Sequence, residues 1–284
     1  MTLKKSFFLF LSIFVFTFHL NASSLTSNNK IIWDSVHFPP SLISEGDYKY
    51  QGYSDMAREL FIINLKNYDH EIITGSLEKA MQDLEHGENF CFAGLSKNEF
   101  REKFILYSKP YLYSLPNELI IKTKDKKRFK SYIGMKNELN LHKLLQNNGF
   151  TFGYIKHRSY SQYIDRLIEL NYEKKHLLQK EDKERSVGLA KMLAQGQIDY
   201  IIEYPTTFNY TKEEEEIQEE FSMFPIYESS KKIKVYVGCN QNKFGKKVIS
   251  QINNIIDENS ASFESFYRTW LDYDSKKMLE QLEK

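Results

Sequence analysis

The stretch ENFCFAGLSKNEFREKFILYSKPY, from Glu88 to Tyr111, decides the fold predicted for this chain. It begins with an apolar segment over 90–93, turns at the small residues Gly94 and Ser96, and continues into a polar segment that carries Arg101. This order predicts a strand whose carboxyl end opens into a loop with exposed amides and one guanidinium. Because a planar guanidinium meets both oxygens of a carboxylate, the arrangement suits a small carboxylate. The alternative is an ordinary strand and turn with a surface arginine.

Strands and helices alternate on the amino-terminal side of this stretch. The predicted order is a strand at Lys30–Trp33, a helix at Asp55–Lys66, a strand at Glu71–Thr74, and a helix that Ser76 begins and Gly87 ends. Such an alternation predicts a parallel α/β lobe whose ligand crevice lies at the carboxyl ends of the strands. Three residues are expected at that edge: Phe38, Gly94 and Ser96.

Two crossovers are predicted further along the chain. A strand at Asn117–Lys122 and the charged connector after it end the first lobe, and the strand at Lys234–Cys239 returns to it. Helices at Phe244–Ile256 and Ala261–Leu271 follow. The predicted organisation is a first lobe over 23–122, a second lobe over 123–230 and a return segment with the carboxyl-terminal helices over 231–284. Two crossovers imply a hinge and a cleft that closes on a ligand.

A spaced set of residues carries a resemblance to a known family. The pattern S-x(4)-R-x(5)-[FY]-S-x-P-Y resembles the signature of family 3 extracytoplasmic solute-binding proteins of the amino-acid-binding type, and it reads here as Ser96, Arg101, Tyr107, Ser108, Pro110 and Tyr111. The resemblance covers nearly all of the mature chain. It implies a two-lobe periplasmic-binding-protein type II fold, with Ser96 and Arg101 gripping the ligand's carboxylate beside Gly94.

The resemblance also suggests the walls of the pocket. It makes the aromatic residues Trp33 and Phe38 candidates for stacking on the ligand, although both also fit a hydrophobic core. Arg158 and Ser159 stand at the turn before a predicted helix, where exposed amides favour an anion. The family usually has a Gly-Thr-Thr type of turn there, so a solvated surface arginine is the alternative for Arg158.

The carboxylate expected to bind the ligand's ammonium group is displaced by one residue. The segment from Gly196 to Pro205 resembles the family's G-x-x-D segment, with Asp199 as its structural aspartate. Amino-acid binders carry a carboxylate five residues later, but Tyr204 occupies that position and Glu203 precedes it. Because a one-residue slip turns a strand side chain to the other face, either a bulge restores Glu203 to the cleft or the ligand is not an ordinary α-amino acid.

The first 22 residues are typical of a secretory signal peptide. Two lysines precede a short apolar run, and small residues offer cleavage near Ala22. A transmembrane anchor is the rival, but it needs about 20 apolar residues and this run is shorter. No cysteine lies near the cleavage site to take a lipid. The predicted location is therefore the periplasm, with a free mature protein.

Composition limits the remaining possibilities. The 284 residues are 41% hydrophobic and 15% aromatic, which is enough for one large or two moderate cores, and a net charge of +1 favours neither nucleic acid nor an anionic membrane. Cys91 and Cys239 lie in strand-like segments predicted to share a lobe, so they form either a disulfide or two buried thiols. The sequence contains no histidine pattern typical of metal sites and no phosphate-binding loop, so neither metal nor cofactor is predicted.

The function expected from the resemblance is capture of a small carboxylate-bearing solute, such as an amino acid, by a monomer that delivers it to an ABC-type importer. One alternative is a periplasmic enzyme of the same fold, of the cyclohexadienyl dehydratase type, for which Glu203 is the acid or base candidate. Another is a binding protein that presents its ligand to a chemoreceptor. The prediction is a binding protein and not an enzyme.

Overall fold

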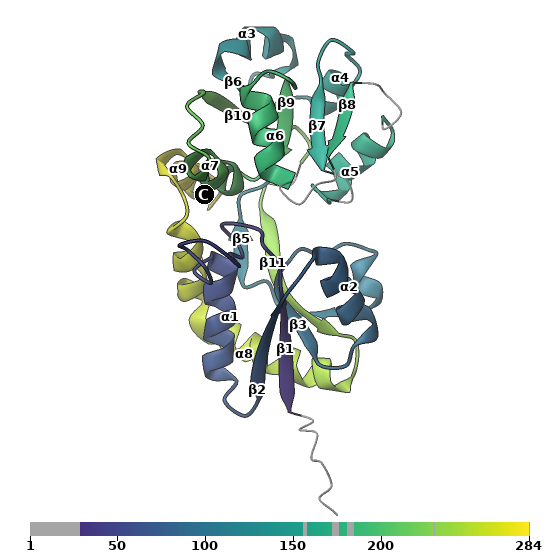
Figure 1. The fold of residues 1–284 in the computed structure, drawn as a ribbon, viewed down its shortest axis with the longest axis vertical. Helices are drawn as coiled ribbons and strands as arrows, with labels where there is room; N and C mark the ends of the chain where they lie inside the picture. Colours follow the sequence, from purple (N-terminus) through teal and green to yellow (C-terminus); the bar gives the residue numbers. More distant parts are fainter. Residues whose placement is uncertain (1–28, 156–157, 172–175, 181–184, 230, 284) are drawn as a thin grey trace, which may run out of the picture.

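The computed structural model describes residues 29–155, 158–171, 176–180, 185–229 and 231–283. The predicted signal peptide and its cleavage site near Ala22 lie outside these residues. The described chain forms two α/β lobes, each built on its own sheet (Figure 1). Among the described residues, no helix is both long enough and apolar enough to span a bilayer.

The first lobe is built on a sheet with the strand order β2-β1-β3-β11-β4, and β5 pairs with β11. Its strands are β1 (Lys30–Ser35), β2 (Asp69–Thr74), β3 (Phe90–Leu95), β4 (Ile105–Tyr107), β5 (Leu112–Ser114) and β11 (Ile233–Asn240). Strands β1, β2 and β3 are parallel, as predicted, and β11 runs antiparallel to β3. The helices of this lobe are α1 (Tyr53–Asn64), α2 (Leu77–His86), the 3-10 turn η1 (Arg101–Lys103) and α8 (Lys243–Arg268).

Alternation along β3 divides the core of the first lobe into two layers. Cys91 and Ala93 face the layer shared with α1 and α8, whereas Phe92 faces the layer shared with α2. Cys239 lies directly opposite Cys91 on β11, and the two form a disulfide. Both cysteines are fully buried. The disulfide alternative is therefore confirmed, and it joins residues 148 positions apart in the sequence.

The second lobe has a five-stranded sheet of order β10-β6-β9-β7-β8. Its strands are β6 (Glu118–Lys122), β7 (Phe152–Ile155), β8 (Leu177–Lys180), β9 (Tyr200–Glu203) and β10 (Phe221–Pro225). Its helices and turns are η2 (Thr123–Asp125), α3 (Lys126–Phe129), η3 (Lys130–Tyr132), α4 (Leu141–Leu145), α5 (Gln162–Glu169), α6 (Arg185–Ala194) and α7 (Pro205–Glu214). Helices α4 and α5 cover one face of the sheet, and α6 and α7 cover the other.

The first crossover lies earlier than the sequence indicated. Strand β6 pairs with β10 and β9 of the second sheet, so by sheet membership the chain leaves the first lobe at 115–117 and not after Lys122. All five residues of β6 are buried, because both faces of this central strand are covered. The return crossover falls between β10 and β11.

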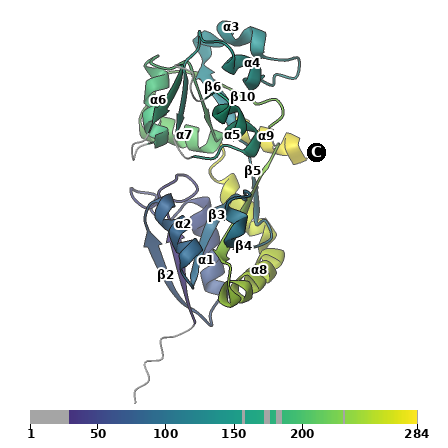
Figure 2. The same cartoon turned by 90° about the vertical axis from the view of Figure 1, so that its right-hand side faces the viewer.

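The carboxyl-terminal segment also differs from the expectation. One kinked helix, α8, replaces the two predicted helices, with non-helical backbone angles at Asn259. Beyond it the chain reaches the second lobe, since Asn209 of α7 donates a 2.6 Å hydrogen bond to Asp272. The last helix, α9 (Tyr273–Glu283), lies at the level of α7 in two perpendicular views (Figure 2). The carboxyl-terminal segment is therefore a third connection between the lobes.

Candidate functional site

The carboxyl ends of the parallel strands in the two lobes face each other, and side chains there make contact. Phe38, in the loop after β1, packs edge-on against Tyr204, which follows β9, with ring centroids 6.3 Å apart. Gln162 at the start of α5 donates a 3.3 Å hydrogen bond to Glu99 in the loop after β3. We call the region defined by these four residues the interlobe junction. It is the place where sheets of this kind bind ligands.

Arg101 lies on the first-lobe side of the junction and has no carboxylate partner among the described residues. Its guanidinium donates a 3.3 Å hydrogen bond to the carbonyl of Ser96. Burial lowers the pKa of Arg101, and the nearby Tyr107 and Tyr204 partly offset that effect. No ion pair among the described residues involves Arg101. Within the described part of the chain, this partly desolvated guanidinium thus has no anionic partner.

Gly94 lies near the end of β3, just before the loop that carries Arg101, and its backbone conformation favours glycine. Its φ of +107° lies in the left-handed region, and a Cβ atom there would lie 3.1 Å from the hydroxyl oxygen of Ser54. That hydroxyl is hydrogen-bonded to Ser41 at 2.8 Å and to Tyr111 at 2.9 Å. The carbonyl of Ser96 accepts from Arg101, which keeps the loop folded around the guanidinium.

The two aromatic residues predicted for the pocket wall have different positions. Phe38 is partly exposed and lies at the junction, held by a 2.8 Å backbone hydrogen bond to Leu42. Trp33 is fully buried in the first-lobe core, where it stacks on Phe61 and donates a 3.0 Å hydrogen bond to His70. The core alternative is therefore correct for Trp33. Its side chain faces the α1 layer because it alternates with its strand neighbours.

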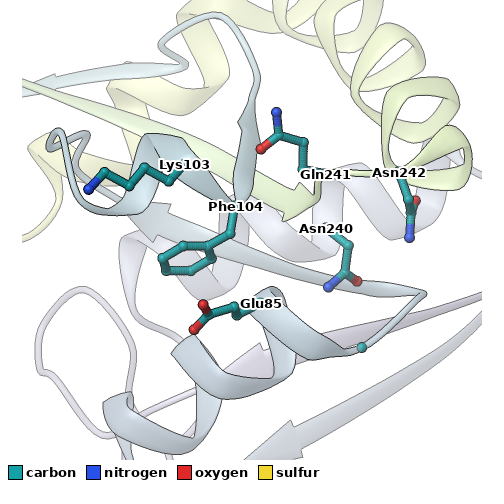
Figure 3. A pocket seen from close by; sticks show the side chains of 7 residues that line it. Glu85, Lys103, Phe104, Asn240, Gln241 and Asn242 are labelled. Atoms are coloured by element: carbon teal, nitrogen blue, oxygen red, sulfur yellow. The ribbon is translucent and has the colours of Figure 1, made fainter.

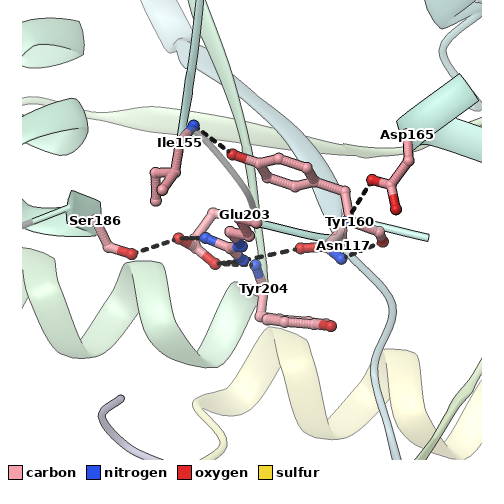
Figure 4. A network of polar contacts seen from close by, with 8 residues as sticks. Asn117, Ile155, Tyr160, Asp165, Ser186, Glu203 and Tyr204 are labelled. Carbon is pink, nitrogen blue, oxygen red and sulfur yellow. Dashed lines mark hydrogen bonds and ion pairs between the residues drawn. The ribbon is translucent and has the colours of Figure 1, made fainter. Parts of the chain in front are cut away.

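Arg158 and Glu203 form an ion pair on the second-lobe side of the junction, in which two guanidinium nitrogens bind the two carboxylate oxygens (Figure 4). Glu203 also accepts hydrogen bonds of 2.8 Å from the hydroxyl of Ser186 and from the backbone N–H of Tyr204. Burial lowers the pKa of Arg158, but the carboxylate of Glu203 outweighs it and holds the pKa above its ordinary value. Glu203 is therefore fully engaged within its own lobe. No bulge accompanies its regular pairing with Glu118 of β6.

Three aromatic rings surround the guanidinium of Arg158. Its central carbon lies 4.7 Å from the ring centre of Tyr160, 5.5 Å from that of Tyr204 and 5.7 Å from that of Phe38. These distances allow cation–π attraction, which strengthens where water is excluded. The solvated alternative for Arg158 is wrong, because its side chain is only 10% exposed.

Ser159 does not point its hydroxyl at the junction. The hydroxyl donates a 2.5 Å hydrogen bond to Asp165 within α5, and the residue is exposed. Ser161 begins α5 instead, since its hydroxyl accepts a 3.3 Å hydrogen bond from the backbone N–H of Ile164. The predicted turn thus supplies Arg158 to the junction, while Ser159 stabilises the start of the helix.

Three residues of this site carry no signal in the sequence. Asn117 in the first crossover accepts from Arg158 at 3.3 Å and donates to the carbonyl of Tyr160 at 2.7 Å. The hydroxyl of Tyr160 accepts a 2.8 Å hydrogen bond from the backbone N–H of Ile155, and Ser186 binds Glu203. These residues support the ion pair from three separate elements. They come together only because segments far apart in the sequence pack side by side.

A surface pocket of about 430 Å³ lies away from the junction, between the end of α2, the start of β4 and the carboxyl end of β11 (Figure 3). Its lining is mostly polar and consists of Glu85, Gly87, Lys103, Phe104, Asn240, Gln241 and Asn242. Asn240 is committed to the fold, since its amide donates to the carbonyls of Asp83 and Leu84. The part of the chain that the structure describes contains no group of three or more residues suited to hold a metal ion.

Comparison with solved structures identifies the fold. No protein-family model and no curated protein matches the sequence. A structure concerning glutathione import via GshT and the cystine importer TcyBC of Streptococcus mutans matches with a TM-score of 0.67 at 13% identity, over 87% of this chain and 99% of that one. The amino acid ABC transporter substrate-binding protein AbpA of Streptococcus pneumoniae, bound to L-arginine, matches with a TM-score of 0.62 at 16% identity, over 89% and 97%.

A histidine kinase sensor domain with similarity to periplasmic binding proteins also matches, with a TM-score of 0.64 at 14% identity, over 86% of this chain and 96% of that one. Each neighbour is covered almost completely, so the likeness extends over both lobes. At these identities it concerns the fold alone. The two α/β sheets and their crossovers therefore form the periplasmic-binding-protein type II fold.

Proposed function

We propose that this chain is a solute-binding protein of the family 3, amino-acid-binding type that captures a small carboxylate-bearing solute at the interlobe junction. The observation that carries the proposal is the guanidinium of Arg101, which is partly buried there and has no carboxylate partner among the described residues. A ligand carboxylate compensates this charge through two parallel hydrogen bonds. The residues from Ser96 to Tyr111 that resemble the family's signature support the same assignment.

Binding uses both lobes. Arg101 and the loop from Gly94 to Ser96 hold the carboxylate on the first lobe, and the rings of Phe38 and Tyr204 supply apolar contact. Closure of the lobes excludes water, which strengthens each charge-assisted hydrogen bond because the local dielectric constant falls. Arg158 and Glu203 shape the second-lobe wall.

Delivery to an ABC importer from the periplasm is the primary role in this proposal. Support comes from the fold and from neighbours whose names describe substrate-binding proteins of amino acid importers. The kinase sensor domain among the neighbours favours sensing as the second candidate. Loss of uptake of the bound solute when the gene is deleted supports import. Unchanged uptake together with an altered kinase response supports sensing.

The enzymatic alternative has weaker support. Glu203, the acid or base candidate, is held by Arg158, Ser186 and the backbone N–H of Tyr204, so proton transfer by it first requires breaking these bonds. Incubation with cyclohexadienyl carboxylates tests this point directly. Turnover that disappears in Glu203→Gln contradicts the pure binding role.

Thermal unfolding against a panel of small carboxylates tests the proposal, because a ligand that binds only the folded protein raises its apparent stability by about 2.7 kcal/mol at 100 times Kd. Arg101→Gln is expected to abolish the shift caused by any carboxylate that stabilises the unmodified protein. Lys103→Gln, in the same turn η1, is the matched control and is expected to retain the shift. An equal shift in Arg101→Gln contradicts the assigned site.

A further inference from the structure

Of the two arginines at the interlobe junction, one has a carboxylate partner among the described residues and the other has none. On the second lobe, Arg158 and Glu203 cancel each other through their double hydrogen bond. On the first lobe, the guanidinium of Arg101 bonds, among the described residues, only to the neutral carbonyl of Ser96. These three side chains therefore leave the junction with one positive charge that has no counterion.

Among the described residues, none of the other carboxylates that contacts place near the junction forms an ion pair with Arg101. Glu99 is exposed and already accepts a hydrogen bond from Gln162. Asp165 is engaged by the hydroxyl of Ser159 inside α5. Glu118, opposite Glu203 on β6, is fully buried and burial raises its pKa to about 7, so it has no surface to offer a ligand.

A ligand's own charges must fit this arrangement. One ligand carboxylate gives Arg101 the counterion that it lacks among the described residues. An ammonium group bound at the same place cannot pair with Glu203, because Arg158 already binds both oxygens of that carboxylate. The ammonium group would also lie close to the positive guanidinium of Arg158. A buried charge without a partner is costly, so the ammonium group opposes binding.

The uncharged part of the ligand meets aromatic surface. The rings of Phe38 and Tyr204 are 6.3 Å apart, and Tyr160 lies beneath the guanidinium of Arg158. The rings of Phe38 and Tyr204 carry no charge. An apolar or aromatic body attached to the carboxylate therefore gains contact area without leaving a polar group unpaired.

We propose that the junction selects a monocarboxylate without an ammonium group, of the 2-oxo acid or N-acyl amino acid class, and that Arg158 is the residue that excludes free amino acids. This inference rests on the proposed function and narrows its ligand. Arg158 acts by pairing with Glu203. It is therefore a specificity-determining residue that needs no direct contact with the carboxylate of the ligand.

Calorimetric titration with matched pairs tests the inference: pyruvate against alanine, 4-methyl-2-oxopentanoate against leucine, and phenylpyruvate against phenylalanine. In the unmodified protein at least one oxo acid is expected to bind 100-fold or more tightly than its amino acid. Arg158→Met releases Glu203, and the preference is expected to reverse towards the amino acid. Arg158→Lys retains a cation beside Glu203 and is expected to keep the original preference.

The outcomes separate the two proposals. If an amino acid binds as tightly as its oxo acid and Arg101→Gln abolishes both, the inference is wrong while the proposed function stands. If none of the six probes nor N-acetylphenylalanine binds in a manner that depends on Arg101, the inference fails together with the proposed function. If Arg158→Met does not fold by circular dichroism, the ranking of ligands by the unmodified protein and by Arg158→Lys decides the question.

Discussion

Arg158 and Glu203 are joined by two hydrogen bonds although 45 residues separate them, and their side chains are only 10% and 4% exposed. Strands β7 and β9, which are parallel neighbours, bring the two residues together. Removing one partner leaves the other as an unpaired buried charge, and such changes cost about 3–5 kcal/mol.

We therefore expect Glu203→Gln to lower the free energy of unfolding by about 3–5 kcal/mol, as measured by urea titration. The double variant Arg158→Met/Glu203→Gln is expected to recover part of this loss, because no charge is then stranded. Equal losses in the single and double variants contradict the assignment of the cost to the stranded guanidinium.

The disulfide between Cys91 and Cys239 closes a loop over a sequence separation of 148 residues, and both cysteines are fully buried. A cross-link of this length reduces the entropy of the unfolded chain, so its loss is expected to lower the free energy of unfolding by about 2–5 kcal/mol. Urea titrations with and without dithiothreitol measure this difference. A Cys91→Ala/Cys239→Ala variant is the control, and its stability is expected to be independent of the reductant.

Glu118 makes stability depend on pH. Both carboxylate oxygens are buried without a hydrogen-bond partner in the described chain, and burial raises the pKa from 4.5 to about 7. Because the folded state holds the proton more tightly, this contribution to stability is complete below pH 4.5 and is lost as the pH rises through about 7.

The glutamine variant isolates this effect. Glu118→Gln does not titrate, so the unmodified protein is expected to lose roughly 2.5 kcal/mol of stability relative to the variant between pH 5 and pH 8, at about 1.4 kcal/mol per pKa unit. Asp34, whose pKa burial also raises to about 7, is present in both proteins and cancels in the difference. A difference that stays constant with pH shows that Glu118 is ionised throughout.

Gly94 is expected to resist substitution. Alanine there must adopt a φ of +107° and bring its Cβ within 3.1 Å of the Ser54 hydroxyl, so Gly94→Ala is expected to destabilise the protein by about 1–3 kcal/mol. Gly46→Ala is the control. Gly46 also has a positive φ, of +79°, but no atom lies within 4 Å of a Cβ built there, so this variant measures the cost of the backbone conformation without a contact. Equal losses at both sites mean that contact with Ser54 contributes nothing.

The two tryptophans offer a fluorescence test of lobe movement. Trp270 packs against Tyr48 of the first lobe at 5.6 Å and against Tyr210 of the second at 5.8 Å, whereas Trp33 is buried within the first lobe. The Trp33→Phe variant, which keeps only Trp270, is expected to change its emission when a carboxylate binds. Trp270→Phe keeps only the buried tryptophan and is expected to respond little. A larger response in Trp270→Phe contradicts closure at this contact.

Local chemistry was sufficient to predict much of the first lobe. Ser76 begins α2 by accepting a 3.1 Å hydrogen bond from the backbone N–H of Lys79, and Gly87 ends it, as their types and positions indicated. The apolar segment over 90–93 predicted the strand at Phe90, and the two cysteines form a disulfide because β3 and β11 are neighbours. Such features depend on a few adjacent residues or on one strand pairing.

The positions of several residues depend on packing between distant segments, and these positions could not be predicted from the sequence. Trp33 and Phe38 both fitted a pocket wall, but the packing of α1 on the sheet assigned Trp33 to the core. For Arg158 the sequence left a solvated position open as the alternative, because nothing near it in the sequence shows that Glu203 lies beside it. The first crossover was placed after β6 and not before it, since a buried apolar strand fits either sheet equally well.

The position of the disulfide has a mechanical consequence. All five strands of the second sheet, from Glu118 to Pro225, lie between Cys91 and Cys239 in the sequence. When the two ends of the chain are pulled apart, tension passes through the sulfur atoms and bypasses the second lobe. Reduction exposes that lobe to the load, and the 148-residue separation adds about 500 Å of extensible chain at roughly 3.5 Å per residue.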